Sequence, residues 1–160
     1  MSGPALATYP VVVSEAVREC RDFYVGWFGF EVVFAAEWIA VLGAGGVPAL
    51  AFMHPEHPTS PPAPGAYRGH GTFLTIQVAD AKHECERVVA GGLRCELDLT
   101  DEPWGQRRFA VVDPAGMWVD VVEQTEAATG WWEHHGGSVA GSAMTSTAPR
   151  SASNVPEGPA

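Results

Sequence analysis

The segment Asp101–Glu123 (DEPWGQRRFAVVDPAGMWVDVVE) carries the residues best suited to bind a ligand. Trp118 and Asp120 stand two positions apart in a stretch that is expected to be a strand. Side chains alternate between the two faces of a strand, so both side chains point to the same side. A carboxylate and a large aromatic ring on one face indicate a pocket. The alternative is an edge strand on which Asp120 is solvated and Trp118 is half-buried.

The same segment is expected to fold as a turn, a strand, a tight turn and a second strand. Residues 102–105 cannot continue a helix, because Pro103 lacks a backbone N–H. Arg107–Val112 is rich in β-forming residues, residues 113–116 (DPAG) have the composition of a hairpin turn, and Met117–Val122 is a second apolar stretch. The segment therefore predicts a β-hairpin.

An internal repeat surrounds this hairpin. A displacement of about 65 residues aligns Glu19 with Glu84 and Cys20 with Cys85, and it exceeds the periods of solenoids and propellers. Each copy is expected to hold a strand, an amphipathic helix and a second strand. These are Tyr9–Ser14, Glu15–Trp27 and Glu31–Phe34 in the first copy, and Phe73–Val78, Asp80–Ala90 and Arg94–Leu97 in the second. The sequence therefore predicts two copies of one module that begins with a strand and a helix.

The composition limits the classes of function. At 160 residues the chain is long enough for one domain with a hydrophobic core. The net charge of −10 argues against a nucleic-acid partner, because phosphate contacts need clustered Lys and Arg. The acidity fits a cationic ligand, or it serves only to keep the protein in solution.

Cysteine use and hydropathy bear on the compartment. Cys20, Cys85 and Cys95 are odd in number, and two of them fall on the buried faces of expected helices, so we expect reduced thiols. The chain shows no signal peptide and no run of about 18 apolar residues. We therefore expect a cytoplasmic protein with no membrane partner.

Composition also predicts the domain boundaries. One domain is expected over residues 1–126, with a first module at about 7–53, a linker or mobile flap at 54–71 that contains five prolines, and a second module at about 72–126. Residues 127–160 are rich in Gly, Ser, Ala and Pro, and they bury too little apolar surface to offset chain ordering. We expect them to form a disordered tail, in which the Trp131-Trp132 pair could dock back.

The duplicated module that ends in a strand, DPAG and a strand resembles the vicinal oxygen chelate superfamily, also called the glyoxalase/bleomycin resistance/dioxygenase family. The resemblance covers about Tyr9–Glu123. ECRDFYVGWFGFEVVF resembles the first helix and second strand of the family, and EPWGQRRFAVVDPAGMWVDVVEQ is most similar to the metal-free bleomycin-resistance branch. The resemblance implies an α+β fold in which two βαβββ modules form a curled mixed sheet around a concave cleft. It also implies a homodimer that completes the cleft.

Enzymes of this family usually hold a divalent metal on the concave strands, through a His or Gln on the first strand and a Glu on the last strand of each module. The resemblance places Tyr9 and Phe73 at the two first-strand positions and Asp120 at the second module's last-strand position. The last strand of the first module, Pro48–Met53, has no carboxylate. Phe73 cannot ligate a metal, so we expect neither a metal nor another cofactor.

Another small polar cluster is His54, Glu56 and His57, in the sequence HPEHP. These residues could hold a metal, or they could belong to a proline-locked loop in which histidine is simply tolerated. The second interpretation is favoured.

Aromatic residues take the place of the metal ligands in the expected cleft. Strand alternation and the resemblance together give the ligand-binding candidates Tyr9, Trp38, Phe73, Thr75, Trp104, Phe109, Trp118 and Asp120, with Trp104 and Phe109 near the rim. Such a lining would stack on a flat heteroaromatic or cationic small molecule, with Asp120 as the counter-charge. The alternative is that several of these aromatic residues belong to the core.

Three functions remain open at this point. The first is a metal-free protein that binds and sequesters a small molecule, for example an antibiotic of the bleomycin type. The second is a glyoxalase-like or dioxygenase-like enzyme, a lyase, isomerase or oxygenase in which Asp120 would be the candidate catalytic base. The third is a regulatory or biosynthetic binding domain whose tail recruits a partner.

Overall fold

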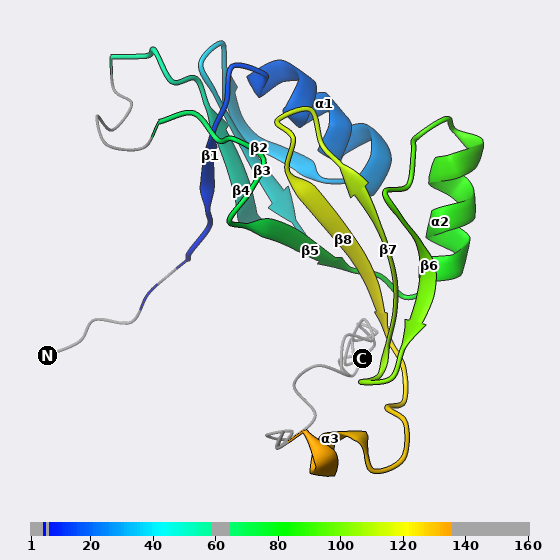
Figure 1. Ribbon diagram of the computed structural model, residues 1–160. Helices are drawn as coiled ribbons and strands as arrows, with labels where there is room; N and C mark the ends of the chain where they lie inside the picture. Colours follow the sequence, from blue (N-terminus) through cyan, green and yellow to red (C-terminus); the bar gives the residue numbers. More distant parts are fainter. Residues whose placement is uncertain (1–4, 6, 59–64, 136–160) are drawn as a thin grey trace, which may run out of the picture.

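The computed structural model describes residues 5, 7–58 and 65–135 of the chain (Figure 1). They form two modules of the same architecture. The first module consists of β1 (Val11–Val13), α1 (Val17–Phe28), β2 (Glu31–Ala36), β3 (Ile39–Ala44) and β4 (Val47–Met53). The second consists of β5 (Phe73–Gln77), α2 (Ala81–Ala90), β6 (Leu97–Glu102), β7 (Gln106–Val112) and β8 (Trp118–Gln124). A short helix, α3 (Trp131–His134), follows.

Each module forms one four-stranded mixed sheet, and the strand orders β1-β4-β3-β2 and β5-β8-β7-β6 are equivalent. In both sheets the first strand of the module is parallel to the last, and the other pairs are antiparallel. The prediction of an α+β fold with two βαβββ modules is confirmed. Within the described residues, no strand pairing joins the two sheets. Among the described residues, no helix is long and apolar enough to cross a membrane.

The sequence pattern explains where the helices begin and end. In α1, Val17, Cys20 and Tyr24 recur at helical spacing and are buried, and Gly29 ends the helix with a φ of 67° that favours glycine. In α2, Asp80 caps the first turn, because its Oδ1 accepts a hydrogen bond of 2.8 Å from the backbone N–H of His83.

One strand lies later in the chain than predicted. Residues 94–97 were expected to be a strand, but β6 begins only at Leu97 and runs to Glu102. The chain first has to turn away from α2, which it does through Gly92 at a φ of 93°, and the N–H of Leu93 still bonds to the carbonyl of Val88. Pairing with β7 can start only after this turn.

The structure also differs from the prediction at the start of the expected tail. Residues 127–135 were expected to be disordered, but the N–H of Ala128 bonds to the carbonyl of Pro103, and the Trp131 ring lies 5.9 Å from that of Trp104. Figure 1 shows α3 beyond the end of β8. The remainder of the expected tail and residues 59–64 of the expected flap lie outside the described residues.

A buried carboxylate joins the two modules. The Tyr24 hydroxyl of α1 donates a hydrogen bond of 2.8 Å to Oδ2 of Asp113, in the turn between β7 and β8. Oδ1 of Asp113 accepts from the backbone N–H groups of Ala115 and Met117, at 2.9 and 2.8 Å. Burial raises the pKa of Asp113, and these hydrogen bonds oppose that rise. Burial, together with the nearby Asp113 charge, also raises the pKa of Tyr24, so the hydroxyl stays a donor.

Removing the Tyr24 hydroxyl should destabilise the fold. We expect Tyr24→Phe to lower the free energy of unfolding by about 1.5–3 kcal/mol, because a buried charged acceptor loses its partner. Urea unfolding followed by circular dichroism measures this change. Tyr67→Phe is the matched control, since the Tyr67 hydroxyl donates to the exposed carbonyl of Thr72. If both variants lost the same free energy of unfolding, the hydrogen bond to Asp113 would contribute no more to stability than the exposed one to Thr72.

Candidate functional site

The side of the second sheet that faces away from α2, here called the open face, carries the predicted Trp118 and Asp120. Alternate residues of β8, Val119 and Val121, pack into the core beneath the helices, so Trp118 and Asp120 lie on the opposite side. The strand register places Phe73 of β5 beside Trp118. These two rings line an open cleft of about 660 Å³. Phe73 is 60% exposed and Trp118 is 37% exposed, so both rings are available for stacking.

Asp120 lies one step further along the open face, between Thr75 of β5 and Ala110 of β7. It is only 4% exposed, and its Oδ1 has no hydrogen-bond partner among the described residues. Its other oxygen, Oδ2, lies 3.5 Å from Nη1 of Arg108. Burial raises the pKa of Asp120, the Arg108 charge opposes the rise, and the charge of Glu102 adds to it.

Arg108 is shared by two carboxylates. Its Nη2 lies 2.8 Å from Oε1 of Glu102, a shorter contact than the one to Asp120. The Arg108 guanidinium also lies 5.2 Å from the centre of the Trp104 ring. One positive and two negative charges leave this cluster with a net charge of −1. The cluster is therefore suited to a cationic group.

Trp104 does not share a cage with Trp118, although both were predicted to bind the ligand. Trp104 lies in the turn before β7, and Gln106 at the start of β7 pairs with Gln124 at the end of β8. The seven residues of β8 separate this end from Trp118 by roughly 20 Å. Trp104 instead donates a hydrogen bond to Gln106 and packs against Trp131.

Phe109 was predicted near the rim of the cleft, and this prediction is wrong. It is fully buried and pairs with Val121 on the core side of the sheet. Trp38 lies in the turn between β2 and β3 and stacks on His57, with ring centres 3.9 Å apart. Tyr9 precedes β1 and is 41% exposed. Of the predicted residues, the structure thus brings together the four on β5 and β8: Phe73, Thr75, Trp118 and Asp120.

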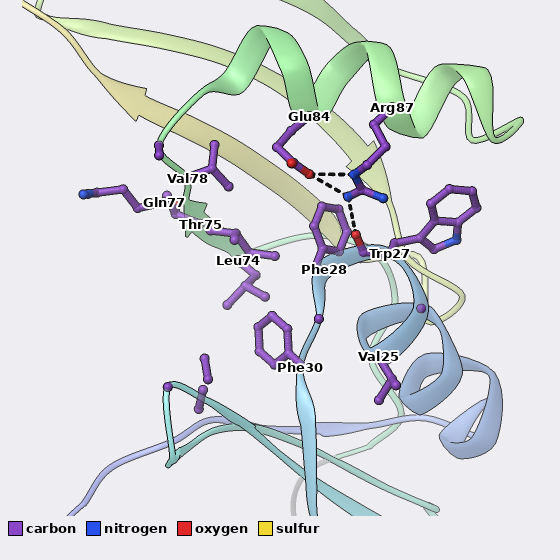
Figure 2. Close-up of a pocket in the computed structure, with 17 residues that line it drawn as sticks. Val25, Trp27, Phe28, Phe30, Leu74, Thr75, Gln77, Val78, Glu84 and Arg87 are labelled. Atoms are coloured by element: carbon purple, nitrogen blue, oxygen red, sulfur yellow. Dashed lines mark hydrogen bonds and ion pairs between the residues drawn. The ribbon is translucent and has the colours of Figure 1, made fainter. Parts of the chain in front are cut away.

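A second cavity of about 880 Å³ lies where the two modules meet, between the end of α1, β5 and α2 (Figure 2). Figure 2 shows Phe28, Phe30 and Leu74 along its apolar side. On the other side, Arg87 pairs with Glu84 and donates to the backbone carbonyl of Trp27. Arg87 thus joins α2 to the end of α1, and its charge is already neutralised by Glu84.

Comparison with known proteins identifies the family. Residues 8–121 match the model of the Glyoxalase/Bleomycin resistance protein/Dioxygenase superfamily. The chain belongs to this superfamily. None of the curated proteins matches the sequence.

Solved structures share the fold of this superfamily member at low sequence identity. A glyoxalase/bleomycin resistance protein/dioxygenase from Nocardioides is 20% identical, with a TM-score of 0.62 over 79% of this chain and 87% of that chain. Lactoylglutathione lyase from Agrobacterium tumefaciens is 19% identical, with a TM-score of 0.60 over 76% and 96%. TnmS3, an antibiotic binding protein from Streptomyces sp. CB03234, is 22% identical, with a TM-score of 0.59 over 78% and 100%.

The residues of this chain do not fit the divalent metal that enzymes of the superfamily usually hold. On the side of the first sheet that faces away from α1, the central row is entirely apolar: Val11, Ala51, Val41 and Phe34. On the second sheet, Phe73 offers no donor atom and Asp120 faces the cation of Arg108. Within the described ranges, no three His, Cys, Asp or Glu side chains gather closely enough to hold a metal, and this includes the cluster of His54, Glu56 and His57.

The contact with Arg108 should influence the pKa of the Asp120 carboxyl. In Arg108→Gln the Asp120 carboxyl loses the positive charge that opposes the effect of burial, so its pKa should rise further. A pH titration of the carboxyl carbon by NMR measures this shift. In Arg107→Gln, the matched control, the pKa of Asp120 should not change, because Arg107 pairs with Asp101 at 2.6 Å. An unchanged pKa of Asp120 in Arg108→Gln would contradict the contact.

Proposed function

We propose that this protein binds a small molecule that carries a flat ring and a cationic group, and that it acts by sequestering this molecule without a metal. The observation that carries the proposal is the buried Oδ1 of Asp120, which has no partner among the described residues and lies one step along the sheet from the exposed rings of Phe73 and Trp118. The rings and the carboxylate are roughly 7 Å apart along the strand, so one ligand can span both once the side chains that bury Oδ1 move aside.

The magnitudes support such a ligand. An unsatisfied buried acceptor costs about 1–3 kcal/mol, and a donor on the ligand recovers this cost. Aromatic stacking adds about 0.5–1.5 kcal/mol beyond burial, and a cation over a tryptophan adds about 0.5–2 kcal/mol. With the burial of a drug-sized molecule, these contributions reach the roughly 8 kcal/mol of a micromolar complex. The net charge of −10 additionally attracts cations.

Sequestration needs no catalysis, only enough protein to hold the ligand by mass action. The resemblance of residues 102–124 to the bleomycin-resistance branch supports an antibiotic as the ligand. TnmS3, which has the same fold, is an antibiotic binding protein, and this likeness supports the proposal.

A homodimer is the second part of the proposal. The apolar row of the first sheet includes Val11 and Phe34, which are 46% and 55% exposed in the single chain. Phe73 and Trp118 on the second sheet are also exposed. Covering the first sheet's row with the second sheet of another copy would bury both sets of side chains and close the ligand cleft.

Replacing Asp120 should weaken binding of a cationic aromatic probe. We expect Asp120→Asn to raise the dissociation constant for bleomycin roughly 10- to 100-fold, because a charged hydrogen bond is lost. Tryptophan fluorescence titration measures the constant. Asp101→Asn removes the same charge from an exposed site paired with Arg107, so it should leave the constant unchanged. Equal affinities of wild type and Asp120→Asn for bleomycin would refute this role of Asp120.

The wild-type complex should also depend on pH. Because burial raises the pKa of Asp120, this carboxyl is protonated at a higher pH than an exposed aspartate. Affinity for the cationic probe should therefore be full above this pKa and should fall as the pH is lowered through it. The affinity of Asp120→Asn should not show this step. A step of the same size in both proteins would assign the pH dependence to another group.

The dimer can be tested on the first sheet. Phe34→Asp places a charge in the apolar row and should raise the dissociation constant of the dimer at least about tenfold. Val89→Asp is the control, because Val89 on α2 is 52% exposed and lies away from both proposed interface surfaces. Light scattering after size exclusion gives the mass of each species. A wild-type monomer at all concentrations would contradict this part of the proposal.

One observation favours an enzyme as the alternative. A buried carboxyl with a raised pKa, as in Asp120, is suited to act as a general base. Mass spectrometry of the probe after incubation separates the two functions. An unchanged probe that is fully recovered after denaturation fits sequestration, and a chemically altered probe fits catalysis.

A further inference from the structure

Two cysteines lie side by side between α2 and the sheet beneath it. The Sγ atoms of Cys85, in α2, and Cys95, just before β6, are 3.9 Å apart. Both side chains are half-buried and pack against the edge of the core. The third cysteine, Cys20, is fully buried in the core cluster. Only the Cys85–Cys95 pair combines proximity with access to solvent.

We propose that Cys85 and Cys95 form a site of reversible oxidation, in which a small disulfide such as oxidised glutathione converts the two thiols into an intramolecular disulfide. This modification does not rest on the ligand-binding function. It would fasten the middle of α2 to the segment that precedes β6.

The local geometry supports closure of this bond. A disulfide joins sulfur atoms about 2.0 Å apart, so the two Sγ atoms have to approach by roughly 1.9 Å. Rotation about the Cα–Cβ bonds moves sulfur atoms over such distances. The connecting segment contains Gly91 and Gly92, and Gly92, at a φ of 93°, turns the chain at the end of α2. The ten-residue separation closes only a short loop.

The chemistry proceeds by two thiol–disulfide exchanges. The Cys85 thiolate attacks one sulfur of oxidised glutathione, which forms a mixed disulfide and releases one glutathione thiolate. Burial, together with the neighbouring Cys85, raises the pKa of the Cys95 thiol to about 11, so Cys95 enters as a thiol and gives its proton to the released thiolate. The Cys95 sulfur then attacks the Cys85 sulfur and releases the second glutathione as a thiolate. This thiolate takes up a proton from the solvent, which balances the proton that Cys85 lost when its thiolate formed. Two protein thiols are oxidised and one glutathione disulfide is reduced.

Intact mass and peptide mapping of the full chain test the proposal. After incubation with oxidised glutathione, the wild-type chain should lose the mass of two hydrogen atoms, and its thiols in denaturant should fall from three to one. Peptide mapping should join Cys85 to Cys95 and leave Cys20 unmodified. Dithiothreitol should restore all three thiols. A stable glutathione adduct on the wild-type chain, an unchanged mass or a bond that involves Cys20 would overturn the proposal.

Single variants identify the intermediate. Cys95→Ser should accumulate a glutathione adduct on Cys85, because the resolving thiol is missing. Cys85→Ser should react more slowly, because the remaining thiol has the raised pKa. Circular dichroism checks that both variants are folded, and the wild-type mapping decides the proposal without them. Oxidation of wild type should also raise the urea midpoint, whereas oxidation of Cys95→Ser should not.

Discussion

The arrangement of the open face depends on the hydrogen bonds of one buried residue, Asp113. Its Oδ1 holds the turn between β7 and β8 through two backbone N–H groups, and its Oδ2 holds the Tyr24 hydroxyl from the other module. The turn fixes the register in which Val112 pairs with Trp118, and that register decides which residues of β7 stand beside Asp120. A carboxylate that is 4% exposed is costly without partners, and three donors offset that cost here. The strand register of the open face and the packing of the two modules therefore depend on the same buried carboxylate.

Features that follow from local chemistry could be predicted from the sequence. The DPAG turn and the two-residue period of a strand are enough to place Trp118 and Asp120 on one face. The displacement of about 65 residues is enough to predict two modules. Arg107 and Arg108 precede the same turn, and only one of them can share the face of Asp120. Counting the register back from the turn selects Arg108, because it stands opposite Val122 on the face that carries Asp120.

Features that depend on tertiary packing could not be predicted in this way. Phe109 alternates with Arg108, so it belongs to the core side, yet a Phe in a sequence does not show which side the helix covers. Trp104 lies in the turn before β7 and Trp118 is the first residue of β8, so the length of these strands holds them at opposite ends of the hairpin. Neither the contact of Trp104 with Trp131 nor the stack of Trp38 on His57 has a local signal, because each joins segments that only the fold brings together.

The two modules share one architecture, but the sides of their sheets that face away from the helices differ in chemistry. The first sheet has an apolar row that offers only burial, whereas the second has two rings, a carboxylate and an arginine. Glu102 lies nearer to Arg108 than Asp120 does, so it takes much of the arginine's charge and leaves Asp120 incompletely neutralised. A close ion pair between Asp120 and Arg108 would have satisfied both oxygens of the carboxylate and left no unpaired acceptor. The competition for Arg108 leaves Oδ1 of the buried Asp120 carboxylate without a hydrogen-bond partner among the described residues, at a cost in stability.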